Sequence, residues 1–365
     1  MEWQGIVTVT APQYFAGAAD STIRKRLLLK LLESRGRIKF NETGTVNYWD
    51  VQYREHPMEP YGDAGSIVYQ REDLYRQLTT DWRGYVMTDM MTEKERLMND
   101  GDLAIINRYD RILPNMQKAL THRFSGELYT NGYAAGNNNR LHGVESFLAS
   151  TGSPTAADRI VQASQAYGGL TTAVGNGGTW SALLSTYPNA GLATDWPDGS
   201  GDVEYDFMTP KLVNWSSNNW GTNSTLWEDN CERALRQANI WLQTTCGEDG
   251  MPTIYLLAGN LFYPYMNKQE SKMRIIVPHK EADDLGFPMV LNQEGVMIKN
   301  EFDVPVNSGY ALNIDQMELA SLDSQLFGTR GPQYDIKTDA YLFKAGFFGN
   351  ARWNPKYFAK FSNYA

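Results

Sequence analysis

Cysteine and histidine are scarce in this chain, which argues against a disulfide framework and against a metal site. Of 365 residues, only Cys231 and Cys246 are cysteines and four are histidines. Two cysteines at this spacing form neither a disulfide framework nor a CxxC motif, so we expect free thiols and a reducing compartment. The histidines show no HExxH or HxH spacing, which favours surface or hydrogen-bonded core residues over a metal site. They are His56, His122, His142 and His279.

Motifs for nucleotide and ester chemistry are also missing. Gly175–Gly178 is glycine-rich, but it lacks the Lys-Ser/Thr pair and the preceding strand of a phosphate-binding loop, so we interpret it as a flexible loop. No Gly-x-Ser-x-Gly nucleophile elbow occurs. Asp283–Asp284 and the group Asp202, Glu204 and Asp206 have the chemistry to hold a cation, but we interpret them as solvated loop acids. We therefore expect no enzyme, no cofactor and no catalytic, cofactor-binding or metal residues.

A cationic leader and a long apolar run are absent as well. The first ten residues contain Glu2 and no cationic run, unlike a signal peptide. Ile254–Asn267, the least charged stretch, is shorter than the ~20 apolar residues that span a bilayer, and Asn260 and Pro264 interrupt it. We expect no membrane association. The net charge of −9 argues against a dedicated nucleic-acid binder, and it suits a surface that faces nucleic acid without binding it tightly.

The front of the chain contains a loose arm followed by a short helix. The helix is predicted over residues 22–34, because its leucines fall on one face and its basic residues on the other. Asp20 or Ser21 is the expected cap, and Gly36 is expected to end the helix.

Residues 37–82 are expected to form a long two-stranded excursion. One strand is predicted around 46–53, a turn cluster over 56–63, and the start of a return strand at 67–70. A two-stranded ribbon alone is marginally stable in water, so this excursion needs a partner to lie on. Its predicted apolar face consists of Val46, Tyr48, Val51 and Tyr53.

A long amphipathic helix is predicted over residues 92–130. Thr92 and Glu95 match the capping box, and Pro114 is expected to kink the helix. Apolar residues recur every three or four positions and form one stripe. They are Ile105, Tyr109, Ile112, Met116, Leu120, Phe124 and Leu128.

Behind this helix, a polar, loop-rich middle precedes a compact α/β module. Residues 136–139 are a low-complexity polar link, and residues 152–223, which have few charges, are interpreted as irregular β and loop. The elements predicted after them are helices over 226–245 and 261–267 and strands over 252–257, 274–277, 288–291, 296–298 and 310–314.

Several C-terminal segments resemble the Hong Kong ninety-seven-type coat fold of tailed-bacteriophage major capsid proteins. Met251-Pro-Thr-Ile-Tyr-Leu-Leu-Ala-Gly-Asn-Leu-Phe is similar to that family's strand-then-helix segment, and Asp303-Val-Pro-Val to its apolar-Pro-Val strand. Gly309-Tyr-Ala-Leu-Asn resembles the strand that follows, and Ala351-Arg-Trp-Asn-Pro-Lys-Tyr-Phe-Ala-Lys-Phe the closing strand. The order and spacing of these segments carry the resemblance.

The resemblance implies an α+β fold with a peripheral and an axial domain. Its expected parts are the N-terminal arm and short helix (1–36), an extended E-loop (37–82), the peripheral domain (83–223) with a spine helix (92–130) and the loop-rich middle, the axial domain (224–335), and C-terminal strands that return to the peripheral domain (336–365).

The resemblance also implies a major capsid protein that self-assembles as hexamers and pentamers into an icosahedral shell. The shell would enclose double-stranded DNA without sequence-specific binding, and portal, scaffold and decoration proteins would be further partners. The expected location is the virion capsid, after synthesis in the host cytoplasm. Some family members crosslink an E-loop lysine to an asparagine on a neighbour. No lysine occurs from Phe40 to Thr80, so we expect no such bond.

Two other functions fit parts of the sequence. The same fold would serve an encapsulin-like bacterial nanocompartment. Alternatively, a carbohydrate-binding or glycan-hydrolysing protein would stack sugars on tryptophans beside an acid pair. Against the second reading, no export signal is seen, and aromatic residues are equally expected at subunit interfaces. Its candidate tryptophans are Trp180, Trp196, Trp215 and Trp220.

Overall fold

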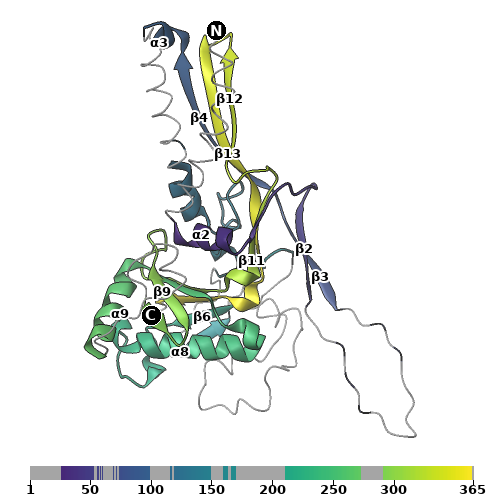
Figure 1. The fold of residues 1–365 in the computed structure, drawn as a ribbon. Coiled ribbons are helices and arrows are strands. Elements are labelled where there is room, and N and C mark those ends of the chain that lie inside the picture. The colour runs from purple at the N-terminus through teal and green to yellow at the C-terminus, as the bar shows by residue number, and fades with distance from the viewer. Residues whose placement is uncertain are drawn as a thin grey trace.

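The structure is a computed structural model. It describes residues 26–52, 74–98, 119–148, 159–162, 166–169, 210–272 and 291–363, and the single positions 56, 58, 60, 69, 71 and 116. A body of helices and strands carries two excursions (Figure 1). One is a tall ribbon of β4 (Arg83–Thr92), β12 (Gly328–Asp335) and β13 (Ala340–Trp353), and the other is a hairpin of β2 (Asn47–Gln52) and β3 (Tyr75–Thr80). The expected α+β class is confirmed.

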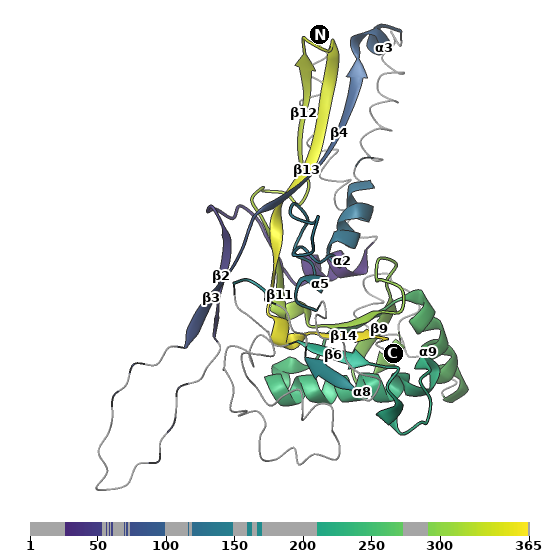
Figure 2. The same ribbon diagram turned by 180° about the vertical axis from the view of Figure 1, so that it is seen from behind.

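In the described part of the chain, seven strands form the larger sheet, in the order β5-β6-β14-β10-β7-β9-β8. These are β5 Ile160–Gln162, β6 Lys211–Asn214, β7 Ile254–Leu257, β8 Leu291–Gln293, β9 Val296–Asn300, β10 Gly309–Leu312 and β14 Ala359–Ser362. Helix α8 (Trp227–Cys246) lies along β6 and β14 in the view from behind (Figure 2). Together with α9 (Gly259–Lys272), it covers an apolar core that includes Trp241, Tyr255 and Phe361.

Strand β13 organises the other large sheet. It pairs antiparallel with β4, β12 and β11 (Met317–Ser321), and β1 (Ile38–Lys39) adds parallel to β11. A second core lies against this sheet, where the ring centroids of Phe124 and Phe347 are 4.6 Å apart. Because β13 is 14 residues long, it runs from the ribbon into the body without a break.

The short elements connect these layers. They are α2 Leu27–Ser34, α3 Glu93–Met98, α5 Glu145–Leu148 and the 3-10 turns η2 Asn218–Trp220, η3 Glu248–Gly250, η4 Ile314–Gln316 and η5 Pro355–Tyr357. The 3-10 turns carry the chain between the two large sheets at two places, through η4 from β10 to β11 and through η5 from β13 to β14.

Local sequence signals explain the helices near the front. The leucines of α2 are buried, and Gly36, directly after its end, has a left-handed φ of +63°. The capping box at α3 is confirmed: the Thr92 N–H donates to Glu95 Oε2 at 3.2 Å, and the Glu95 N–H donates to Thr92 Oγ1 at 3.3 Å. The described residues of the predicted stripe are all buried. They are Met116, Leu120, Phe124 and Leu128.

Three predictions about the C-terminal part need correction. Residues 303–306 form turns rather than a strand, because Pro305 offers no N–H for a ladder while the Val304 N–H donates to Glu301 O and the Ser308 N–H to Pro305 O. The strand expected to reach Ile314 ends at Leu312, where the Asn313 side chain accepts from the Asp315 N–H and starts a 3-10 turn. Helix α9 also starts earlier and ends later than the predicted 261–267.

Some predicted features lie outside the described residues. They are the helix start at 22–25 with its caps, the return strand start at 67–70, the spine-helix segment 99–115 with Pro114, the strand over 274–277 and the first residues of the strand over 288–291.

Candidate assembly surfaces and joints

The inner face of the β2–β3 hairpin is anchored to the body. Trp49 lies opposite Leu78, which is fully buried, and the ring centroids of Trp49 and Tyr167 are 6.0 Å apart. The Thr79 N–H donates to Gly168 O at 2.9 Å. Gly168 has a φ of +61°, and a Cβ there would lie 2.6 Å from the Leu78 side chain, so this contact requires glycine. The base of the hairpin is therefore part of the core.

The outer face of the hairpin exposes aromatic side chains. Tyr48 is 52% exposed and Tyr75 is 60% exposed, and Val46 beside them is also exposed. The prediction that Val46, Tyr48, Val51 and Tyr53 share one apolar face is wrong. Successive strand residues point to opposite faces, so Val51, three residues after Tyr48, lies on the buried inner face. Tyr53 is outside the described residues.

Polar side chains of β13 hold the root of the hairpin. The Asn350 Nδ2 donates to Asp81 O at 2.7 Å, just after β3. The Arg352 Nε donates to Asn47 Oδ1 at 2.7 Å, at the start of β2, and its Nη2 donates to Glu42 Oε2 at 2.8 Å. The sequence analysis did not single out these residues. The sequence feature that could have indicated them is a pair of polar residues, two positions apart, that follows a run of aromatic and small residues in β13.

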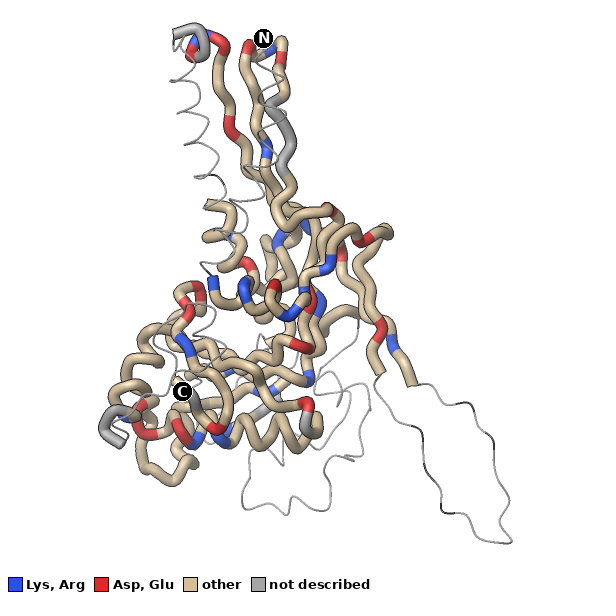
Figure 3. The backbone as a smooth tube through the Cα atoms, in the orientation of Figure 1, with Lys and Arg blue, Asp and Glu red and all other residues tan. Residues whose placement is uncertain are grey.

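The ribbon exposes apolar side chains on one face. Met90 pairs with Leu342 across β4 and β13, and both are exposed together with Val86. On the opposite face, Tyr85 contacts Phe124 edge to face. Charged residues are few along the ribbon between its tip and the body (Figure 3). Exposed Thr88 and Lys344 pair on the same face, between Met90 and Val86. Exposed apolar side chains with a few polar ones among them, on a projecting element, are typical of a contact surface.

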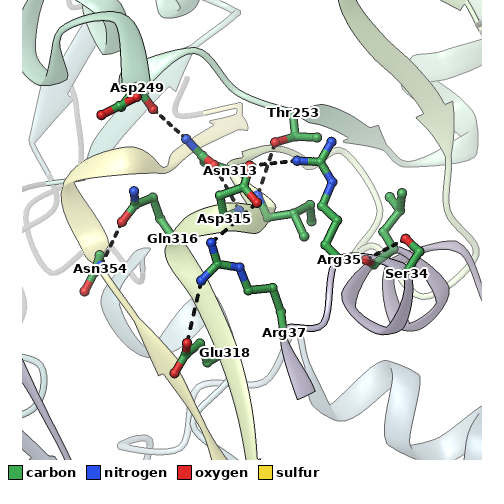
Figure 4. A network of polar contacts seen from close by, with 12 residues as sticks. Ser34, Arg35, Arg37, Asp249, Thr253, Asn313, Asp315, Gln316, Glu318 and Asn354 are labelled. Carbon is green, nitrogen blue, oxygen red and sulfur yellow. Dashed lines mark hydrogen bonds and ion pairs between the residues drawn. The ribbon is translucent and has the colours of Figure 1, made fainter. Parts of the chain in front are cut away.

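A network of ion pairs joins the front of the chain to η4, where the chain passes from β10 to β11 (Figure 4). The Arg35 Nη1 lies 2.7 Å from Asp315 Oδ2, and Arg37 lies 3.5 Å from the other Asp315 oxygen and 3.6 Å from Glu318. Asn313 donates to Asp249 O at 2.7 Å. α2, β1 and η4 are thus held together at one joint.

A second joint lies between α5 and the larger sheet. Lys360 on β14 forms an ion pair with Glu145 at 2.8 Å, and each side chain is 14% exposed. The Tyr310 hydroxyl on β10 also donates to Glu145, and the Tyr310 ring stacks on Tyr129. One carboxylate therefore binds two neighbouring strands of the sheet.

Burial shifts the pKa values of two titratable side chains, raising that of Glu301 and lowering that of His142. Burial raises the pKa of Glu301 to about 7; nearby Asp303 adds to the rise, and Arg26 and Lys299 oppose it. Burial lowers the pKa of His142 to about 4; Arg83 adds to the decrease, and Asp81 opposes it. The His142 ring fills the space beside Gly132 and lies tilted against the Tyr133 ring, with the ring centroids 4.3 Å apart.

These shifts predict how a Glu301→Gln variant responds to pH. Between pH 4.5 and 7 the native state binds more protons at Glu301 than the unfolded state does, so ionising Glu301 lowers the free energy of unfolding as pH rises. We expect Glu301→Gln to be more stable than the natural chain at pH 8, by about 1–3 kcal/mol. The difference should disappear near pH 4.5.

Urea unfolding at pH 8 and pH 4.5 measures this effect. His142 contributes in the opposite sense, because between pH 6.5 and 4 the unfolded state binds the additional proton and stability falls as pH falls. His142 is present in both proteins, so its contribution cancels in the comparison. A stability difference that is equal at the two pH values would contradict the assignment to Glu301.

The described residues do not bring the histidines together. His142 is buried, whereas His56 and His122 are exposed. The His122 Nδ1 accepts a hydrogen bond from Arg26. His279 is outside the described residues. In the part of the chain that the structure describes, no group of three His, Cys, Asp or Glu side chains is arranged to hold a metal ion. Both cysteines are free thiols, as expected, and Cys231 is buried.

Two of the tryptophans proposed for sugar stacking lie in the core. Trp215 and Trp220 are 8% and 4% exposed, and the Trp220 Nε1 donates to Asn214 O. Neither ring has a face available for a sugar. Trp180 and Trp196 lie outside the described residues. The segments Gly175–Gly178, Asp283–Asp284 and 202–206 also lie outside them.

Within the described ranges, no helix is both long and apolar enough to cross a membrane.

Comparison with known proteins identifies the fold. No protein-family model matches the sequence, and no curated protein matches it. Among solved structures, a chain of the cyanophage A-1(L) capsid is similar, with a TM-score of 0.55, 13% identity and 92% of each chain covered. The capsid of Myoviridae phage XM1 gives 0.49, with 11% identity over 91% of this chain and 92% of the other. The Pyrococcus furiosus virus-like particle gives 0.43, with 11% identity and 96% of each chain covered.

The first of these similarities extends over nearly the whole of both chains. The protein therefore has a capsid-protein fold of the Hong Kong ninety-seven type, as its C-terminal segments predict.

Proposed function

We propose that this protein is the major capsid protein of a tailed double-stranded DNA bacteriophage. It assembles as hexamers and pentamers into an icosahedral shell and has no enzymatic role. The observation that carries the proposal is the pair of excursions on a body with a capsid-protein fold. The hairpin and the ribbon both project from the body and both expose apolar side chains that a lone subunit leaves in water. A neighbouring subunit would cover them.

Each part of the chain has a proposed place in the shell. The module of 224–335, apart from β11 and β12, meets its copies around the capsomer axis, and the ribbon with residues 92–130 forms the periphery. The hairpin lies over the peripheral part of a neighbour and there buries Tyr48 and Tyr75. The N-terminal arm that precedes the short helix, residues 1–20, latches onto another subunit. Since residues 40–80 contain no lysine, these contacts hold by packing rather than by an E-loop lysine bond.

The enclosed partner is double-stranded DNA, bound without sequence readout. A net charge of −9 offers few phosphate contacts and lets the shell face DNA without trapping it. Portal, scaffold and decoration proteins are further partners of this role. The shell would reside in the virion after synthesis in the host cytoplasm.

Negative-stain electron microscopy with sedimentation on the recombinant chain tests the proposal. We expect closed particles or ring-shaped capsomers of hundreds of kilodaltons or more. A stable monomer or dimer that never assembles, even under crowding, would overturn it.

The second candidate is an encapsulin-like compartment with the same fold. Particles that enclose protein cargo instead of DNA, isolated from the native host, would favour it. The glycan-binding alternative is not favoured, because two of its four tryptophans are in the core.

A further inference from the structure

The hairpin and the ribbon are consecutive parts of one strand path. β3 ends at Thr80 and β4 begins at Arg83, so only Asp81 and Trp82 separate them. The Trp82 Nε1 donates to Gly44 O at 3.0 Å, which closes the root across the two arms of the excursion. β4 then pairs with β13 from Arg83 onward. Whatever fixes this two-residue bend fixes the direction of the hairpin relative to the ribbon.

Arg352 on β13 lies at this bend and is 12% exposed. Its guanidinium bonds to Asn47, the first residue of β2, at 2.7 Å and to Glu42, on the segment that leads into β2, at 2.8 Å. It also lies 3.7 Å from Glu318 on β11. A planar guanidinium has five donors in a fixed fork and serves three acceptors that lie in different directions around it. Glutamine has only two donors, and the three donors of lysine all radiate from one nitrogen.

Asn47 links Arg352 to β3, the strand that returns from the hairpin. Its side chain is fully buried, its Oδ1 accepts from Arg352, and its Nδ2 donates to Thr80 Oγ1 at 3.0 Å. Asn350, two residues before Arg352, holds the bend itself through Asp81 O. Both arms of the hairpin root are therefore bonded to β13, and Glu318 is shared with Arg37 at the joint behind it.

We propose that Arg352 is the positioning residue that fixes the angle between the hairpin and the ribbon, so that the two excursions approach a neighbouring subunit as one rigid unit. The inference rests on the proposed shell function for its consequence in assembly, but not for its consequence in the single chain. A hairpin released from Arg352 keeps its inner-face packing on Tyr167 and the Asn350 bond to Asp81 O. It loses the bonds that hold residues 42–47 in a fixed direction at the root.

Arg352→Gln tests the proposal by amide hydrogen exchange on the full-length chain. We expect exchange in residues 42–52 and 75–82 to accelerate at least tenfold, while exchange in α8 changes less than twofold. Arg236→Gln is the matched control, because it removes an exposed arginine that is ion-paired with Glu294 at 2.6 Å, far along the chain from the hairpin. Arg236 is itself in α8, so the control is evaluated at the hairpin, where exchange in residues 42–52 and 75–82 should not change.

Glu42→Gln provides a second route if Arg352→Gln does not fold. It weakens the bond on the hairpin side and leaves Arg352 beside Glu318; it should accelerate exchange in the same residues by a smaller factor. If exchange accelerates equally in α8 and in the hairpin, Arg352 contributes only to overall stability and the proposal is overturned. Unchanged exchange in residues 42–52 and 75–82 would also overturn it.

Electron microscopy of the same variants separates this proposal from the proposed function. If the natural chain forms closed shells, Arg352→Gln should give open or irregular assemblies, and closed regular shells from it would overturn the role in assembly. If the natural chain forms no shells while the local exchange effect holds, the proposed function fails and the positioning role of Arg352 in the single chain stands.

Discussion

Replacing residues 53–74 by an Asn-Gly turn is expected to give a folded chain that no longer closes into shells. Gln52 and Tyr75 are directly paired at the described end of the hairpin, and a two-residue type I′ turn joins directly paired strand ends. The replacement keeps Trp49 and Leu78 in the core and keeps the bonds from Arg352 and Asn350. It removes the far part of the excursion, which we propose lies on a neighbour.

Circular dichroism, thermal unfolding and negative-stain microscopy together test this prediction. The secondary structure and the melting temperature of the single chain should stay close to those of the natural protein, and closed particles should be absent. A double variant, Tyr48→Ser with Tyr75→Ser, is the companion because it keeps the hairpin at full length and removes only its exposed rings. It should assemble more weakly than the natural chain. Normal closed shells from the shortened chain would contradict the assignment of the hairpin.

Residue patterns predicted the elements with a regular apolar or capping pattern better than the elements without one. The apolar face of α8 placed that helix within one residue of each end, and the Thr92–Glu95 signal identified the start of α3. Both signals are local, because a helix makes its bonds within one segment. Strand β3 has no comparable signal: its residues Tyr-Arg-Gln-Leu-Thr-Thr carry one buried apolar side chain, Leu78, since its outer face is open.

Strand β6 shows why the middle of the chain was predicted as irregular. Its residues Lys-Leu-Val-Asn include a lysine and an asparagine, yet all four are buried. Lys211 is accommodated because its Nζ donates to Lys356 O at 2.9 Å, and burial lowers its pKa to about 8. That partner lies 145 positions away, so no residue near β6 in the sequence indicates that Lys211 is buried.

The bonds at the root of the hairpin could not be predicted from the sequence for the same reason. Arg352 and Asn350 lie in a segment that resembles the closing strand of the coat fold, but their partners Asn47 and Asp81 lie some 300 and 270 positions earlier. Composition and spacing identify the kind of fold, whereas the bonds that aim its excursions appear only when distant strands are paired.

Gly349→Ala is expected to cause the largest loss of stability that a single added methyl group can cause in the described part of β13. Gly349 pairs with Ser321 of β11 on one side and with Arg83 of β4 on the other, so the body sheet and the ribbon meet at this residue. A Cβ at this position would lie 2.0 Å from Ala320 O and 2.7 Å from the Phe347 ring. The first of these is backbone in a paired strand and cannot move aside as a side-chain end could.

We expect Gly349→Ala to lower the free energy of unfolding by about 3 kcal/mol or more, because overpacking against paired backbone forces the strands apart. Denaturant unfolding of the purified chain measures the loss, and Gly349→Val should prevent accumulation of folded protein. Gly126→Ala is the matched control: Gly126 lies in the helix over 119–127, and an added Cβ meets nothing within 4 Å. The control should be neutral or stabilising by up to about 1 kcal/mol, since alanine favours a helix over glycine.

Equal stabilities for Gly349→Ala and Gly126→Ala would show that β11 and β13 can separate at this point without cost. The ribbon would then be free to move relative to the body, and Arg352, three residues further along the same strand, could not hold a fixed angle between them. A large loss at Gly349 with none at Gly126 instead makes the crossing of β4, β11 and β13 the rigid centre from which both excursions project. The hairpin would then reach a neighbouring subunit in a direction set before any contact forms, which reduces the conformational entropy lost on assembly.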